Sequence, residues 1–256
     1  MKLKEIYEQT DALAPFSLSG EFCEKYASYD NSGILLDCAG EIDTVLLSLD
    51  LSAAAINRAK QIGAQLILTH HPAIFQPLKK LTAESTVTQC ATSGISILSA
   101  HLNLDCAEEG IDDSLVFALG GTPLKIFQPL SLGGYGRVSK LEKELPLNEF
   151  VSKIEEKLHT RRVLSYGERT VKRIASFCGA GMDEESILFA HENGADTFVS
   201  SDAKHHLLAL ILELNMNAVV LTHYAAENFG FFKFYQKIKE KLPSVRVEYF
   251  TDERLM

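Results

Sequence analysis

Short apolar runs alternate with amphipathic segments along the first half of the chain. An apolar run of three to six residues between turn residues is typical of a buried strand. Strands are therefore predicted at 34–36, 44–49, 66–68 and 95–100. Apolar residues recur at helical spacing in other segments, and helices are predicted at 2–13, 53–62 and 83–92. Asp50 and Ser52 are candidate N-caps of the second helix, and Gly63 ends it.

The second half continues the same alternation of strands and helices. Helices are predicted from Asp112 or Asp113 to Leu119 and at 148–158, 183–191, 203–214 and 229–241. Strands are predicted at 173–178, 197–199, 218–221 and 245–250, and the segment 122–130 is either a strand or a connector. The glycine-rich segment 133–138 is predicted to be a flexible turn. Strands that alternate with helices indicate an α/β protein with largely parallel sheets.

Two parts of the chain resemble each other. The helix-to-strand segment 55–71 matches 186–202, with Gly63-Ala64 over Gly194-Ala195. The strand segment 96–105 matches 218–227, which aligns His101 with His223 and Asp105 with Glu227. We therefore predict two similar α/β lobes, 1–127 and 128–256, with an approximate boundary across which terminal elements can be exchanged. Their strand ends would face a shared cleft, because ligands bind beyond the carboxyl ends of parallel strands.

Composition narrows the classes of function. The 256 residues are 46% hydrophobic, which is ample for a core, and the net charge of −9 argues against general nucleic-acid binding. Five scattered cysteines, none in a CxxC motif, favour a reducing compartment over a disulfide framework. No signal peptide or membrane-spanning run is evident, so we expect a soluble, cytoplasmic protein without a membrane partner.

The candidate chemistry is concentrated where the predicted strand 66–68 ends. Thr69 is followed by the adjacent histidines His70 and His71 and then by Pro72. Neighbouring strand residues point to opposite faces, so both rings can reach one site only where the strand breaks into a turn. Pro72 provides such a break, because it removes a backbone donor. The alternative is one core histidine and one surface histidine.

The duplicated pattern adds further candidate ligands of the same kind. If the strand ends share a cleft, the side chains that converge there are His70, His71, His101, Asp105, His223 and Glu227. Imidazoles and carboxylates without cysteine suit a divalent Zn, Mn, Fe or Co ion. The set is large enough for two ions bridged by Asp105 or Glu227, an arrangement that generates hydroxide near neutral pH. The alternative is that the carboxylates cap helices and the histidines are separate core residues.

Asp202 and His206 have two possible interpretations. They either contact a substrate at the rim of the cleft or are first-turn and surface residues, and the pattern favours the second slightly. His159 and His191 lie on predicted helix surfaces and carry no assigned role.

Several motifs together resemble the NIF-three-like family, also known as type 2 GTP cyclohydrolase I homologues. The motifs are YDNSG at 29–33, THHP at 69–72 with Phe75, HLNLD at 101–105 with Gly110-Ile111, GYGRV at 134–138, Asp202 with His206, and HYAAE at 223–227. They span nearly the whole chain in order. The sequence differs from the usual family pattern at Ser139, Ser201, Thr222 and Ala226, none of which is an expected ligand.

The resemblance implies two α/β lobes around a dinuclear metal site and a toroidal homohexamer. It implies two divalent ions (Zn, Fe or Mn) held by His70, His71, Asp105, His223 and Glu227, with His101 close by. The implied activity is that of a GTP cyclohydrolase acting on a nucleotide-like substrate. In this reaction metal hydroxide attacks C8 of guanine, the ring opens and formate leaves.

Within that reaction, His101 and His206 are the candidate catalytic proton carriers, because a neutral-pKa imidazole suits the task. Arg137 and Lys204 are candidates for binding the triphosphate. Two alternatives remain open. One is a hydrolase of another nucleotide or a phosphoester, and the other is a metal-binding hexameric scaffold or interaction protein without turnover.

Overall fold

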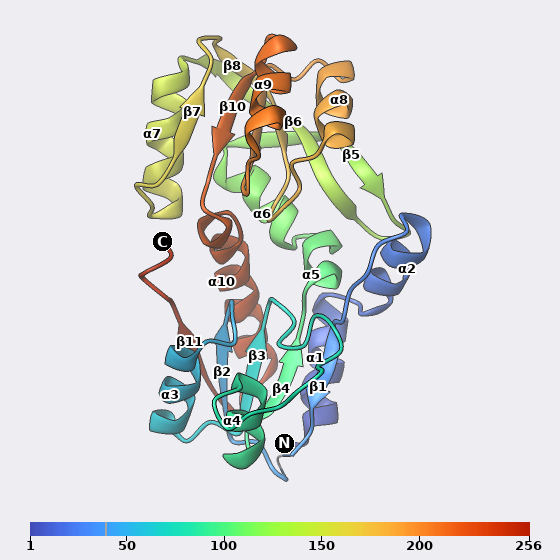
Figure 1. Cartoon of the computed structure of the whole chain (residues 1–256), viewed down its shortest axis with the longest axis vertical. Helices are drawn as coiled ribbons and strands as arrows, with labels where there is room; N and C mark the ends of the chain where they lie inside the picture. The colour runs from blue at the N-terminus through green and yellow to red at the C-terminus, as the bar shows by residue number, and fades with distance from the viewer. Residues whose placement is uncertain (39) are drawn as a thin grey trace. The chain divides into compact units, whose positions relative to one another are not determined.

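A computed structural model of the chain describes residues 1–38 and 40–256. These residues form two compact units, each built around its own sheet (Figure 1). Unit 1 comprises Met1–Ala107 and Phe231–Asp252, and unit 2 comprises Glu108–Gly230 and Glu253–Met256. Strands and helices alternate in both units, which confirms the predicted α/β class with two lobes.

Unit 1 has a five-stranded sheet in the order β1-β4-β3-β2-β11. Its strands are β1 (Gly33–Leu36), β2 (Thr44–Ser48), β3 (Leu66–Thr69), β4 (Ser96–Ser99) and β11 (Arg246–Phe250). Its helices are α1 (Leu3–Leu13), α2 (Ser17–Lys25), α3 (Ala53–Ile62), α4 (Thr86–Thr92) and α5 (Leu102–Cys106), with the later part of α10 (His223–Lys241). All pairs are parallel except the edge strand β1.

The strands β2, β3 and β4 are buried on both faces, which explains their largely apolar sequences. Leu46, Ile67 and Ile97 lie in register and belong to the core cluster that includes residues of α3 and α4. The next row along the strands points to the opposite face. There Tyr249 of β11 contacts Phe231 of α10 at a ring distance of 6.0 Å. The central strand β3 is thus covered on both sides, and its free carboxyl end carries the histidines.

Unit 2 has a six-stranded sheet in the order β5-β6-β8-β9-β10-β7. Its strands are β5 (Gly121–Pro129), β6 (Gly134–Leu145), β7 (Leu164–Tyr166), β8 (Val171–Ser176), β9 (Thr197–Ser200) and β10 (Asn217–Val220). Its helices are α6 (Ile111–Ala118), α7 (Leu147–Leu158), α8 (Glu184–Glu192), α9 (His205–Glu213) and the start of α10. Parallel pairing is confined here to β8, β9 and β10. The turn between β5 and β6 is too short for a parallel crossover.

The segment 133–138 differs from the sequence-based prediction. It was predicted to be a flexible turn, but from Gly134 onward it forms the first part of strand β6. The glycines serve close packing: Gly136 has a φ of +71°, and a Cβ atom there would overlap the ring of Phe177. This prediction was therefore wrong.

Each unit contains the same β-α-β-α-β succession. It comprises β2, α3, β3, α4 and β4 in unit 1, and β8, α8, β9, α9 and β10 in unit 2. The strand pairs within each succession are parallel. The segments that resemble each other in sequence therefore have the same secondary structure. Within the described part of the chain, no helix has both the length and the apolar character needed to cross a bilayer.

Candidate metal centre

The chain turns sharply where β3 ends, and this turn aims both adjacent histidines at one place. The backbone N–H groups of His70 and His71 both donate to the carbonyl of Leu49, at 3.2 and 3.0 Å. The hydroxyl of Thr69 donates to the carbonyl of His71 at 2.8 Å and closes the turn. The two side chains therefore do not alternate as they would in a continuing strand.

Three imidazoles from β3 and the end of β4 form a cluster in unit 1. Their ligand nitrogens all lie within 4.8 Å of one another, and the residues are His70, His71 and His101. His101 follows β4 and caps α5, where its backbone N–H donates to the Ser32 hydroxyl at 3.0 Å. Asp105, in α5, is buried and places a carboxylate oxygen 3.4 Å from Nε2 of His70.

The outer ring nitrogen of each of these histidines contacts an oxygen of the protein. Nδ1 of His70 lies 2.8 Å from the carbonyl of Ala100. A carbonyl can only accept, so this nitrogen donates and Nε2 of the neutral ring keeps its lone pair. Nδ1 of His71 lies 2.7 Å from Asp50, and Nδ1 of His101 lies 2.8 Å from Asp30. Histidines that bind metal ions are oriented in this way by their second nitrogen.

Asp30 is the carboxylate partner of His101, and its side chain is buried. Its second oxygen accepts hydrogen bonds from Ser19 and Ser32, each at 2.5 Å. Burial opposes ionisation, but the hydrogen bonds from His101 and the two serines outweigh it and hold the pKa of Asp30 well below its usual value. For His101, burial lowers the pKa, but the hydrogen bond to Asp30 and the charges of Asp105 and Asp30 raise it overall.

In unit 2 the matching residues, His223 and Glu227, lie on helix α10 and not in a segment before it. Helix α10 was predicted to begin at Phe229, but it begins at His223, which places Glu227 one turn further along the same face. The hydroxyl of Thr222 accepts the N–H of Ala225 at 3.0 Å, an N-capping contact that starts the helix early. Nε2 of His223 lies 3.1 Å from Glu227 Oε1, and its Nδ1 lies 2.6 Å from Asp202.

The loop after β8 packs directly against this pair. A Cβ atom on Gly179 would lie 2.6 Å from Oε1 of Glu227 and 3.4 Å from Nε2 of His223. The backbone of Gly179 has a φ of +55°, which favours glycine on independent grounds. The hydroxyl of Ser201 donates to the Gly179 carbonyl. The site in unit 2 is therefore shaped by main chain as well as by side chains.

Asp112 forms a hydrogen bond with the same loop. Its carboxylate is completely buried and accepts the backbone N–H of Cys178 at 2.9 Å and that of Gly136 at 2.6 Å. The prediction that Asp112 or Asp113 caps α6 was therefore wrong, since Gly110 is the N-cap. Arg137 is also buried and contacts Asp113 at 2.9 Å, so it takes part in an internal ion pair.

The remaining predicted residue, His206, lies in the first turn of α9 and is exposed. The structure gives it no contact with His223 or Glu227 in the described part of unit 2. Of the two candidate N-caps of α3, Ser52 is the cap. Sequence reasoning missed the role of the other, Asp50, which contacts His71. Asp30 was identified only as part of the YDNSG motif at 29–33.

Both sets of side chains suit a divalent transition metal. Each offers imidazole nitrogen and carboxylate oxygen, and each histidine is oriented by an oxygen atom at its outer nitrogen. The fold and these sets together define an α/β protein with candidate metal-ligand clusters.

Comparisons with known proteins identify the family. The model of the Duf34/NIF3 (NGG1p interacting factor 3) family matches residues 1–254, and the chain belongs to this family. It is 31% identical over 254 residues to a "GTP cyclohydrolase 1 type 2 homolog" of Clostridium perfringens, covering 95% of this chain and 94% of the relative. It is 29% identical over 248 residues to a protein of the same name from Methanocaldococcus jannaschii, covering 94% of this chain and 96% of the relative.

Solved structures share the fold over nearly the whole length. The hypothetical protein SA1388 of Staphylococcus aureus superposes with a TM-score of 0.85 at 24% identity, covering 98% of this chain and 97% of that one. Reduced HcgD from Methanocaldococcus jannaschii superposes with a TM-score of 0.81 at 26% identity, covering 98% of each chain. These likenesses agree with the family assignment.

Proposed function

We propose that this protein is a divalent-metal-dependent hydrolase of the GTP cyclohydrolase 1 type 2 kind. One observation carries the proposal: the outer nitrogens of the three proposed ligand histidines, His70, His71 and His223, contact protein oxygens at 2.6–2.8 Å. Histidines that only fill a core do not require this uniform orientation, whereas metal-binding histidines do. The names of the relatives support the specific activity.

The proposed ligands are His70, His71 and Asp105 from unit 1 and His223 and Glu227 from unit 2, holding two ions of Zn, Fe or Mn. Nitrogen and oxygen donors without thiolate suit these ions. That both sets serve one pair of ions is part of the proposal, and it rests on the family to which the chain belongs.

When bound, such ions lower the pKa of a coordinated water and supply hydroxide near neutral pH. In the proposed reaction one water adds at C8 of guanine and the C8–N9 bond breaks, which opens the imidazole ring to a formamide. A second water adds to this formamide, the C8–N7 bond breaks and formate leaves. His101 takes a proton from the first water and returns it to the departing ring nitrogen. Its contact with Asp30 suits this role, because the ionised carboxylate stabilises the protonated imidazole. His206 is the second proposed proton carrier.

The surroundings of His101 support a substrate with a flat ring. Tyr29 and Phe75 are large and exposed, at 48% and 44%, and their rings meet edge to face at 5.6 Å. The Phe75 ring also lies 6.1 Å from that of His101. The side chain of Asn31 donates to the carbonyl of Ile74 at 2.6 Å and ties the two loops together. A purine base could stack on such a surface.

A single-turnover assay tests the activity. Purified protein is stripped with a chelator, reloaded separately with Zn, Fe(II) or Mn, and mixed with substoichiometric GTP, and formate is quantified. We expect formate release that falls at least a hundredfold in His71→Ala. His191→Ala, an exposed histidine in α8, should match the wild type. No formate from GTP with any metal would refute the cyclohydrolase proposal and favour the metal-binding scaffold. Hydrolysis of a different nucleotide would favour the other hydrolase.

We further propose that the protein assembles as a homohexamer and acts in the cytoplasm, as first expected from the family resemblance. Native mass spectrometry of the metal-loaded chain tests the assembly. A six-fold multiple of the 28.3 kDa chain mass is expected, and a stable monomer would contradict it.

A further inference from the structure

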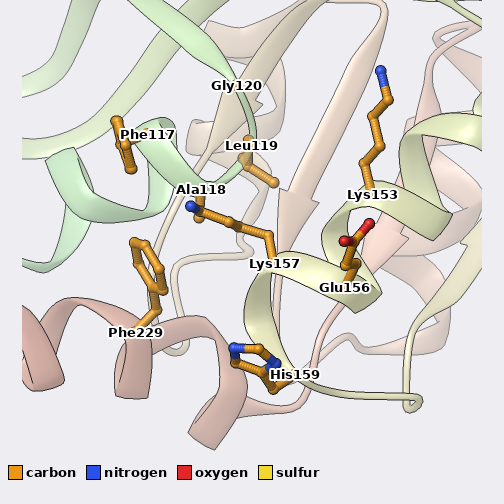
Figure 2. A pocket seen from close by; sticks show the side chains of 9 residues that line it. All are labelled: Phe117, Ala118, Leu119, Gly120, Lys153, Glu156, Lys157, His159 and Phe229. Atoms are coloured by element: carbon orange, nitrogen blue, oxygen red, sulfur yellow. The ribbon is translucent and has the colours of Figure 1, made fainter.

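A hollow in unit 2 is lined by residues that include none of those proposed to bind metal. Its volume is about 580 Å³, within the range of small-molecule sites. It lies between the end of α6, one face of α7 and Phe229 of α10 (Figure 2). We propose that this hollow binds a small flat anion, namely an aromatic ring that carries one negatively charged group. The proposal does not depend on the proposed hydrolase activity.

The apolar wall of the hollow consists of two phenyl rings. Phe117 and Phe229 are nearly parallel, with an angle of 16° and centroids 6.3 Å apart. Phe117 is 58% exposed, which is unusual for so large an apolar side chain. Ala118 and Leu119 add apolar surface at the back. This wall can accept the face or edge of a planar ring, because aromatic rings favour such contacts.

The hollow is positively charged in an acidic protein. Lys157 places its ammonium 5.1 Å from the centroid of Phe117 and 5.4 Å from that of Phe229. Lys153 lies one turn earlier on α7, and the structure gives neither lysine an ion-pair partner within the described residues. Glu156 is the one acidic residue in the lining, and Figure 2 shows its carboxylate directed away from the two rings. Two ammonium groups against one carboxylate favour an anionic ligand.

The two features together define the ligand class. An inorganic anion would pair with the lysines but leave the two phenyl rings exposed to water. A neutral ring would cover the phenyl rings but leave the lysines without an anionic partner. A ring bearing one anionic group satisfies both, with the anion near Lys157 and the ring against Phe229. Lys157 also lies in the last turn of α7, where a cation offsets the helix dipole. Lys153 lies a turn earlier and has no such role, so both lysines need testing.

The test uses the full-length protein and naphthalene-2-sulfonate, because sulfonate is a weak metal ligand and the ring is fluorescent. Binding is measured by anisotropy and calorimetry. We expect one site per chain, with affinity at least tenfold higher than for methanesulfonate or naphthalene-2-methanol. Lys157→Gln, Lys153→Gln and Phe229→Leu should each weaken binding several-fold or more. Lys157→Arg should retain binding.

Two matched controls report on non-specific effects. Lys140→Gln removes an exposed lysine of β6, and Phe232→Leu removes an exposed ring that lies outside the hollow. Both should bind the probe like the wild type. Equal affinity in Lys157→Gln and wild type, or equal affinity for methanesulfonate, would overturn the proposal. A third outcome would also overturn the proposal: the wild-type protein forms an assembly that does not bind the probe, and this assembly dissociates in Phe117→Asp. The hollow would then be covered by a second copy of the chain.

Discussion

Nδ1 of His71 lies 2.7 Å from Oδ1 of Asp50, and this contact fixes which nitrogen of the ring is left for a metal. Asp50 follows β2, and His71 follows the neighbouring strand β3. The register of two adjacent parallel strands therefore sets the orientation of the imidazole. The same relationship recurs in unit 2, where Asp202 follows β9 and contacts His223 beyond β10 at 2.6 Å.

Replacing Asp50 should weaken metal binding with little effect on folding. In Asp50→Ala the His71 ring loses its oxygen partner, and outer contacts of this kind are typically worth about 10–100-fold in metal affinity. The side chain is 40% exposed, so we expect the free energy of unfolding of the metal-free protein to change by less than about 1 kcal/mol. Competition with a fluorescent chelator measures the affinity. Asp43→Ala, an exposed aspartate before β2, serves as the control, and equal affinities in the two variants would contradict the prediction.

Gly179 should tolerate no side chain for two separable reasons. Gly179→Ala introduces a Cβ atom 2.6 Å from Glu227 and also strains a backbone at φ +55°. Gly63→Ala isolates the second effect, because Gly63 has a φ of +68° and nothing lies within 4 Å of its Cβ position. We expect both variants to lose about 1 kcal/mol of stability from the backbone. Only Gly179→Ala should also lose metal, at least tenfold in affinity by elemental analysis after dialysis.

The strands could be predicted from sequence because the signal that reveals them, a short apolar run, lies within each strand itself. A run such as 66–68 is apolar in itself, and burial on both faces of a parallel sheet requires no more than that. The histidines were identified for the same reason, since His70 and His71 directly follow such a run. Helix α5 was missed because a single turn has no amphipathic repeat that could reveal it.

The oxygen partners of the histidines could not be predicted, because they depend on distant residues. Asp30 and His101 are separated by 71 positions, and no local pattern links them. The pairing of β11 with β2 likewise joins segments that lie far apart in the sequence. The start of α10 was missed for a different reason. The apolar residues after His223 resembled a strand end, and Thr222 was not recognised as a cap.

Asp112 should be important for the stability of unit 2. Its buried carboxylate accepts two backbone N–H groups, and Asp112→Ala would leave both without this acceptor. An unsatisfied buried donor costs about 1–3 kcal/mol, so we expect a loss of roughly 2–5 kcal/mol in urea unfolding. Asp113→Ala should cost less, because its side chain is 30% exposed. A loss below 1 kcal/mol in Asp112→Ala would contradict the prediction.

The pair of His101 and Asp30 should make the stability of the metal-free protein depend on pH. The pKa of His101 is raised, so its contribution is complete below the unfolded value of about 6.5 and is lost as pH rises through the folded value. The pKa of Asp30 is lowered, so its contribution is present above about 3.9 and is lost as pH falls towards the folded value. The pair therefore stabilises the folded protein most between about pH 4 and 6.5.

Urea unfolding of wild type and Asp30→Asn with chelator present, from pH 4 to 9, isolates this contribution because both proteins share all other titrating groups. We expect the difference in unfolding free energy to narrow as pH rises above about 6.5, and a difference that stays constant across the range would show that the two groups are not coupled.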